Sequence, residues 1–259
     1  ANRADRELVF HEFFSTYRKY ENTFGTLLYA GLKRDWFYAS TRKYDSCIAA
    51  ALDGNNIPVS VYKQLLEDIH ANLPSLHRYL KLRQKMMGLD DLKYSDLYPS
   101  LVKEVDLEYP IDQSIDLVLK SMAPLGEEYV AGLKQGLESR WMDVYPTEGK
   151  RSGAYSNGSC YDVHPYILLN HNDDYDSIST MAHEFGHAMH SYFSNKYQPY
   201  PTSDYSIFVA EVASTFNENL LNDDLLKQTD DPRVKLFLLG GALERIRTTI
   251  FRQAMFAEF

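Results

Sequence analysis

Two histidines four residues apart, His183 and His187, are the side chains of this sequence best suited to chemistry. On an α-helix, positions four apart lie on the same face, so both imidazoles can bind one metal ion. Glu184 is rotated by about 100° around the helix from His183, which places its carboxylate beside the metal. A general base that acts on a metal-activated water needs this geometry, so the segment predicts a metallopeptidase site.

The five-residue pattern is short, and its alternative explanation is a solvated helix face with two unrelated histidines. Residues 11–15 begin in the same way, but Ser15 stands where the second ligand belongs. We therefore interpret His11 as an ordinary histidine at or near the surface. The 183–187 segment has better support, because it lies in a long helical pattern that begins near Asp176 or Ser177, both suitable N-caps.

A third metal ligand is needed, because a catalytic zinc usually takes three and leaves the fourth position to water. One arrangement uses a histidine ten residues after His183, but Phe193 stands there. Another takes a glutamate from a following helix, and we expect Glu211 from a helix capped by Asp204. Its neighbours are small and apolar, where an unpaired carboxylate would be costly to bury. Glu218, on the same face, is either a hydrogen-bond acceptor for a ligand histidine or a plain surface carboxylate.

Two other histidines near this segment allow less specific predictions. His190 lies about 10 Å along the helix axis from His183, too far for both to bind one ion. We expect His190 to support a ligand histidine or to pack. Pro165 restricts His164 to an extended conformation, so His164 either contacts substrate or is a structural histidine.

The stretch from about Lys150 to Asn170 is rich in glycine, serine and aromatic residues and predicts strands and turns just before the metal helix. An exposed strand can hold an extended peptide by backbone hydrogen bonds. The alternative is a structural hairpin that covers the core. The candidates for substrate binding are Gly153, Ala154 and Tyr155, with the strand of residues 166–169 as the other possibility.

Two stretches, HEFGHAMH at 183–190 and FVAEVASTFNE at 208–218, resemble the thimet oligopeptidase family of zinc metallopeptidases. Three further stretches are similar to its bacterial oligoendopeptidase F branch: GKRSGAYSNG at 149–158, YDVHPYILLN at 161–170 and NTFGTLLY at 22–29. The resemblance covers essentially the whole chain. It implies one zinc ion bound by His183, His187 and Glu211, with Glu184 as base and proton shuttle. It also implies short peptides as substrates.

The resemblance further implies that this sequence is a piece of a longer enzyme. The sequence starts at Ala1 and stops at Phe259 within a helical pattern that begins at Leu236, whereas family members have helical segments before and after this region. We expect the oxyanion-stabilising groups beyond Phe259, and the remaining part of the enzyme as a partner. An alternative is a catalytically incomplete zinc-binding fragment that binds peptides or acts as a scaffold. Another is a structural zinc that joins two helices, although such a site is more often closed by a fourth Cys or His.

Apolar residues recur at helical spacing along most of the chain, and prolines mark several helix starts. The predicted fold is mainly α, with a zincin-type metallopeptidase core and a small β-sheet before the metal-binding helix. We expect residues 1–145 to be a helical region that forms part of the substrate-cleft wall, and residues 146–259 to be the catalytic zinc-binding region. The two regions are expected to form one continuous unit. The predicted helices are 8–20, 61–73, 76–87, 115–122 and 129–141.

The composition is that of an ordinary globular protein, with 44% hydrophobic and 24% charged residues among 259. The net charge of -9 argues against nucleic acid, whose phosphates would be repelled. Cys47 and Cys160 are expected to be free thiols. Without a signal peptide, an apolar run of membrane length or a lipidation motif, we expect a cytoplasmic protein with no membrane partner. Manganese or cobalt could occupy the same ligands as zinc.

Overall fold

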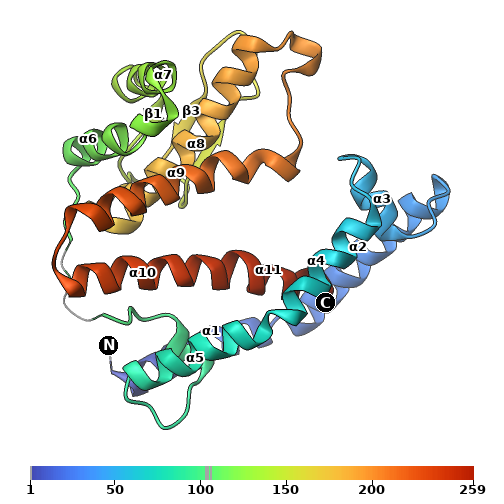
Figure 1. The fold of residues 1–259 in the computed structure, drawn as a ribbon. Helices are drawn as coiled ribbons and strands as arrows, with labels where there is room; N and C mark the ends of the chain where they lie inside the picture. Colours follow the sequence, from blue (N-terminus) through green and yellow to red (C-terminus); the bar gives the residue numbers. More distant parts are fainter. Residues whose placement is uncertain (1, 103–104, 106) are drawn as a thin grey trace. The chain divides into compact units, whose positions relative to one another are not determined.

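The computed structural model describes residues 2–102, 105 and 107–259, and it is mainly helical with one three-stranded sheet (Figure 1). The sheet precedes the helix that carries His183, so the predicted fold class is confirmed. Residue contacts divide the chain into two units, Ala1–Lys103 with Leu239–Phe259, and Glu104–Leu238. This division does not coincide with the expected boundary at residue 145.

The first unit is built from helices with few fully buried apolar side chains. Its elements are α1 (Arg3–Arg18), α2 (Glu21–Thr41), α3 (Cys47–Asp53), α4 (Val59–Ala71), α5 (Leu73–Met86), η1 (Tyr94–Leu97), the second half of α10 (Pro232–Ile246), a π-helical turn (Arg247–Phe251) and α11 (Arg252–Glu258). Helices α2 and α3 were not predicted. In α2 the apolar residues Leu27, Leu28 and Leu32 are all exposed, so they do not produce the one-sided pattern of a helix packed on a core.

A buried carboxylate ties α1 to η1 in the first unit. Asp96 accepts hydrogen bonds from Arg3 Nη2 at 3.0 Å, from Arg6 Nη2 at 2.9 Å and from the backbone N–H of Lys93 at 3.0 Å. A buried charge is tolerated when several donors satisfy it, and the removal of either side leaves an uncompensated group. The attachment of α1 therefore depends on this charge network.

The second unit surrounds one long helix. Its elements are α6 (Ile111–Ser121), η2 (Ala123–Leu125), α7 (Glu127–Glu138), β1 (Met142–Asp143), β2 (Tyr155–Asn157), β3 (Tyr166–Leu168), α8 (Tyr175–Tyr197), η3 (Tyr200–Thr202), α9 (Ile207–Gln228) and the first half of α10. Helix α8 is central because apolar side chains recur along it at intervals of three or four residues and none is accessible to solvent; these are Ile178, Met181, Phe185 and Met189. Each such side chain stabilises the fold by about 1.5–3 kcal/mol.

The sheet has the order β1-β3-β2, with β3 parallel to β1 and antiparallel to β2. The backbone N–H groups of Ile167 and Leu169 donate to Trp141 and Asp143, so these residues face β1. Backbone groups alternate in direction along a strand, and Ser156, which lies opposite Ile167, therefore turns its N–H and C=O to the free edge of β2. Both edges of β3 are used, so the free edges of the sheet belong to its outer strands, β1 and β2.

Several predicted helix boundaries are wrong, because other side chains take the capping role. Helix α8 is capped by Asp174, whose carboxylate accepts the N–H of Ser177 at 2.8 Å, rather than by Asp176 or Ser177. Helix α9 is capped by Ser206, since the carboxylate of Asp204 accepts the N–H of Tyr205 instead. The segment predicted as helix 129–141 ends at Glu138, and its last residues lead into β1.

The cysteines agree with the sequence, since Cys47 and Cys160 are exposed free thiols. Within the described residues, no helix combines the length and apolar content needed to cross a membrane.

Candidate metal centre

Helices α8 and α9 approach each other closely at a glycine. A Cβ atom added to Gly186 would lie 2.6 Å from Ser214 Cα and 2.8 Å from the carbonyl oxygen of Ala213. Carbon atoms in contact are normally about 3.5–4.0 Å apart, so only glycine permits this crossing. The crossing brings the start of α9 beside the middle of α8.

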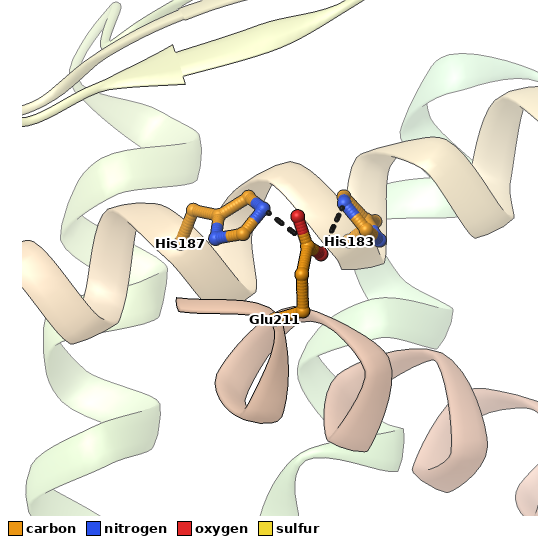
Figure 2. A group of neighbouring side chains, drawn as sticks. All are labelled: His183, His187 and Glu211. Atoms are coloured by element: carbon orange, nitrogen blue, oxygen red, sulfur yellow. Dashed lines mark ion pairs between the residues drawn. The ribbon is translucent and has the colours of Figure 1, made fainter. Parts of the chain in front are cut away.

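Three side chains converge at this crossing, two from α8 and one from α9 (Figure 2). The Oε2 atom of Glu211 lies 3.4 Å from His183 Nε2 and 3.5 Å from His187 Nε2. One ligand atom from each of the three residues falls within 4.8 Å of the others. These are the residues that the sequence singled out as candidate ligands.

The two distances from Glu211 Oε2 to the imidazole nitrogens match those between neighbouring ligands of a tetrahedral metal site. Zinc bonds to imidazole nitrogen and carboxylate oxygen measure about 2.0–2.2 Å, so neighbouring ligand atoms of a tetrahedron lie about 3.3–3.6 Å apart. Both distances to Glu211 Oε2 fall in that range. The donor set of two imidazoles and one carboxylate is also one used by catalytic zinc.

Glu218, two helical turns beyond Glu211 on α9, contacts His183 through the other ring nitrogen, Nδ1. Its Oε1 lies 2.5 Å from His183 Nδ1 and its side chain is 11% exposed, so it is not the plain surface carboxylate of the alternative prediction. Burial alone would lower the pKa of His183, but the hydrogen bond and charge of Glu218 outweigh it and raise the pKa. A proton held on Nδ1 leaves Nε2 with a lone pair directed at the crossing.

Glu184 lies next to these groups and is almost fully buried, at 7% exposure. Burial, reinforced by the charges of Glu211 and Glu218, raises the pKa of Glu184 to about 6, while His183 and the backbone N–H of Ser156 act in the opposite direction. The N–H of Ser156 belongs to the free edge of β2. The sheet therefore meets the helix at the side chain proposed as general base.

The environment of Glu211 differs from the expected one. Helix α9 begins at Ile207, so Glu211 lies near the start of the helix rather than in its middle, and its side chain is 59% exposed. Glu211 is therefore not the buried carboxylate that was expected, and its role as the third ligand stays a prediction. Ser214 Oγ donates to Glu211 Oε2 at 2.7 Å, and serine three residues after a ligand carries no sequence signal for this contact.

Asn217 is a second residue that sequence reasoning missed. Its side chain is 1% exposed; Nδ2 donates to the carbonyl oxygen of Ala182 at 3.2 Å, and Oδ1 accepts from the hydroxyl of Tyr129 at 3.0 Å. Burial raises the pKa of Tyr129 to about 12, so this hydroxyl remains a donor. The amide thus joins α7, α8 and α9 immediately before the first histidine.

Two further histidines pack against aromatic rings. The ring of His190 stacks on Tyr205, with 3.7 Å between centroids and an interplanar angle of 15°. Burial lowers the pKa of His190. His164 stacks on Trp141 at 5.2 Å, and its Nδ1 lies 2.8 Å from the carbonyl oxygen of Pro165. In these contacts both rings pack against neighbouring side chains. A substrate contact by His164 stays a prediction.

The other expected substrate residues lie at or before the edge strand. Gly153 has a φ of 88°, and its carbonyl oxygen accepts Asn170 Nδ2 at 2.8 Å. Ala154 packs against the core, and Tyr155 pairs with Leu168 of β3. His11 is exposed on α1 as predicted.

Comparison with known proteins gives a consistent result. Oligopeptidase PepF of Bacillus subtilis (strain 168) is 49% identical over 258 residues, which cover 100% of this chain and 38% of the relative. Group B oligopeptidase PepB of Streptococcus agalactiae serotype III (strain NEM316) is 41% identical over 259 residues, covering 100% of this chain and 43% of the relative. The crystal structure of oligoendopeptidase-F from Enterococcus faecium is 32% identical with a TM-score of 0.69, covering 100% of this chain and 38% of that one.

The chain thus spans about two fifths of the length of the relatives it matches. The model of peptidase family M3 matches residues 1–259, and the relatives named oligopeptidase match across the whole chain. The resemblance noted in the sequence is therefore confirmed, and the chain belongs to peptidase family M3.

Proposed function

We propose that this chain carries the catalytic centre of a zinc-dependent endopeptidase that hydrolyses internal bonds of short oligopeptides. The observation that carries the proposal is the convergence of His183, His187 and Glu211, whose ligand atoms lie within 4.8 Å of one another, with the carboxylate of Glu184 buried beside them. The family membership and the names of the relatives support peptide substrates. A cytoplasmic location stays a prediction.

The three ligands would hold one zinc ion, which when bound acts as a Lewis acid on the scissile carbonyl and makes water more acidic. Glu184 takes the proton from the attacking water and later delivers it to the leaving amine. Its burial keeps the carboxylate away from bulk solvent, and the N–H of Ser156 holds it in place. Glu218 keeps the proton of His183 on Nδ1.

The edge of β2 is suited to hold the peptide in an extended form. The N–H of Ser156 is used by Glu184, but its carbonyl oxygen faces that edge, and by the same alternation so do the backbone groups of Ala154. Main-chain hydrogen bonds to a strand edge recognise a peptide without regard to most side chains. We therefore propose that the substrate-binding role predicted for Gly153, Ala154 and Tyr155 belongs to β2 and the two residues before it.

Metal content and turnover test the proposal separately. Glu184→Gln should retain about one zinc per chain and lose turnover by roughly 10²–10⁴-fold, because only the proton transfer is removed. Glu211→Ala should lose zinc on dialysis. The control is Glu67→Gln, which removes one negative charge from an exposed position of α4. It should change neither the zinc content nor the turnover.

Zinc is measured by elemental analysis, and cleavage by an internally quenched peptide, for the chain alone and for its full reading frame. Full turnover in Glu184→Gln would refute the role of this base, and unchanged zinc in Glu211→Ala would refute the third ligand.

The second candidate is a zinc-binding module that binds peptides without cleaving them. It is favoured by one observation, the coverage of only 38–43% of the relatives' length. Zinc and peptide binding by the chain alone, with cleavage only in the full reading frame, would identify it. A purely structural zinc is disfavoured by the 59% exposure of Glu211, which leaves the centre open on one side.

A further inference from the structure

A pocket of about 530 Å³ in the second unit lies beside the start of α8. Gly153 and Ala154 form one wall, and Asp176 and Thr180 of α8 form another. Thr180 is four residues before Glu184 and shares its helix face, while Ala154 is two residues before Ser156 and faces the same side of β2. Both walls therefore lead to the proposed general base.

The nitrogen donors of the pocket side chains are already used. The ammonium of Lys150 donates to the carbonyl oxygens of Asp143 and Tyr145 and lies 3.2 Å from the carboxylate of Asp143. The amide nitrogens of Asn170 and Asn172 donate to backbone carbonyl oxygens. The positive charge in the pocket wall is thus neutralised locally.

Two hydrogen-bond acceptors in the pocket wall, in contrast, have no partner among the described residues. The carboxylate of Asp176 has no hydrogen-bond or ion-pair partner among the described residues. Asp176 as a whole is exposed to solvent, while partial burial of its carboxylate and the charges of Asp174 and Glu218 raise the pKa of Asp176. His171, which is 3% exposed, donates from Nε2 to the carbonyl oxygen of Tyr109 at 2.9 Å, so its buried Nδ1 is an acceptor without a partner in the described chain.

We propose that this pocket receives a lysine or arginine side chain of the peptide substrate and that Asp176 selects it. The inference rests on the proposed function, since it places the peptide along β2 with its scissile bond at Glu184. Asp176 lies eight residues before Glu184, or about 12 Å along the helix axis. An extended peptide advances about 3.3 Å per residue, so the second or third residue from the scissile bond can reach Asp176 with a long side chain.

Peptide binding to the zinc-loaded chain tests this proposal without turnover. The probes are short, labelled, otherwise neutral peptides in which one lysine is moved through every position, with glutamine as the reference, and binding is followed by fluorescence anisotropy. At one position lysine should bind about tenfold more tightly than glutamine, as expected for one partly buried charge pair. Asp176→Asn should abolish that preference, and Asp176→Glu, which keeps the charge, should retain it.

The control is Asp116→Asn, which removes an equal charge from an exposed position of α6 and should leave the preference intact. Circular dichroism checks that each variant is folded. A lysine preference that survives in Asp176→Asn, or its absence at every position in the wild type, would overturn the assignment. A preference that depends on Asp176, with no cleavage by either the chain alone or its full reading frame, would support the pocket and refute the proposed hydrolysis, so the two failures are distinguishable.

Discussion

Substitution of Gly186 by alanine should disturb the metal centre although the residue binds nothing. The added methyl carbon would lie 2.6 Å from Ser214 Cα, 2.8 Å from the carbonyl oxygen of Ala213 and 2.9 Å from the Ser214 nitrogen. All three are backbone atoms of α9, so no side chain can rotate to relieve the contact. The helix that carries Glu211 must move away from the helix that carries His183 and His187.

The displacement follows from ordinary contact distances. Carbon atoms pack at about 3.5–4.0 Å, so α9 must retreat by roughly 1 Å. Metal–ligand distances tolerate about 0.2 Å. We expect zinc affinity to fall about 10–100-fold, as when an orienting partner of a ligand is removed. Over-packing should also cost about 1–3 kcal/mol of stability, against about 1 kcal/mol gained from the higher helix propensity of alanine.

Zinc affinity is measured by competition with a chromophoric chelator, and the fold by circular dichroism. Gly132→Ala is a matched control in the neighbouring α7, because its added carbon would meet Met189 Cε at 2.7 Å, the far end of a flexible side chain. That variant should keep zinc affinity within about twofold, since methionine adapts to irregular space. Equal affinity in Gly186→Ala and the wild type would show that the close crossing does not determine the ligand geometry.

Two further predictions concern a ligand contact and the charge network of the first unit. Ser214→Ala removes the 2.7 Å hydrogen bond to Glu211 Oε2 and should weaken zinc binding about tenfold; an unchanged affinity by chelator competition would contradict this. Burial opposes ionisation of Asp96, but Arg6, the N–H of Lys93 and Arg3 together hold its pKa below the usual 3.8. When the pKa of a carboxylate is lower in the folded state, its ionised form stabilises the fold. That stabilisation is complete above the pKa of the unfolded state and is lost as the pH falls through the pKa of the folded state. Hydrogen exchange in α1 should therefore accelerate below about pH 4, and in Asp96→Asn it should already be fast at neutral pH.

The sequence predicted the parts of this molecule that depend on helical spacing. His183, His187 and Glu211 follow from positions along single helices, and α8 is recognisable because its apolar residues face one core. The residues that sequence missed depend on how helices meet. Ser214 and Asn217 become important only because α9 crosses α8 at Gly186.

The missed secondary structure has equally simple causes. Strand β1 is two residues long, too short for an alternating pattern, and it exists because Trp141 and Asp143 accept the N–H groups of Ile167 and Leu169. Helix caps were misplaced because several Asp and Ser residues compete at each helix start, and the backbone path chooses among them.

The buried amide of Asn217 has a consequence for how this centre can vary among proteins. It joins the carbonyl of Ala182 to the hydroxyl of Tyr129, and a slide of α9 by one turn, about 5.4 Å, would leave it unpaired at a cost of about 1–3 kcal/mol. The position of α9 along α8 is therefore fixed by side chains of the helices themselves. The connection of residues 198–206 does not have to set this position. Insertions there can therefore add new surface while Glu211 stays beside the two histidines.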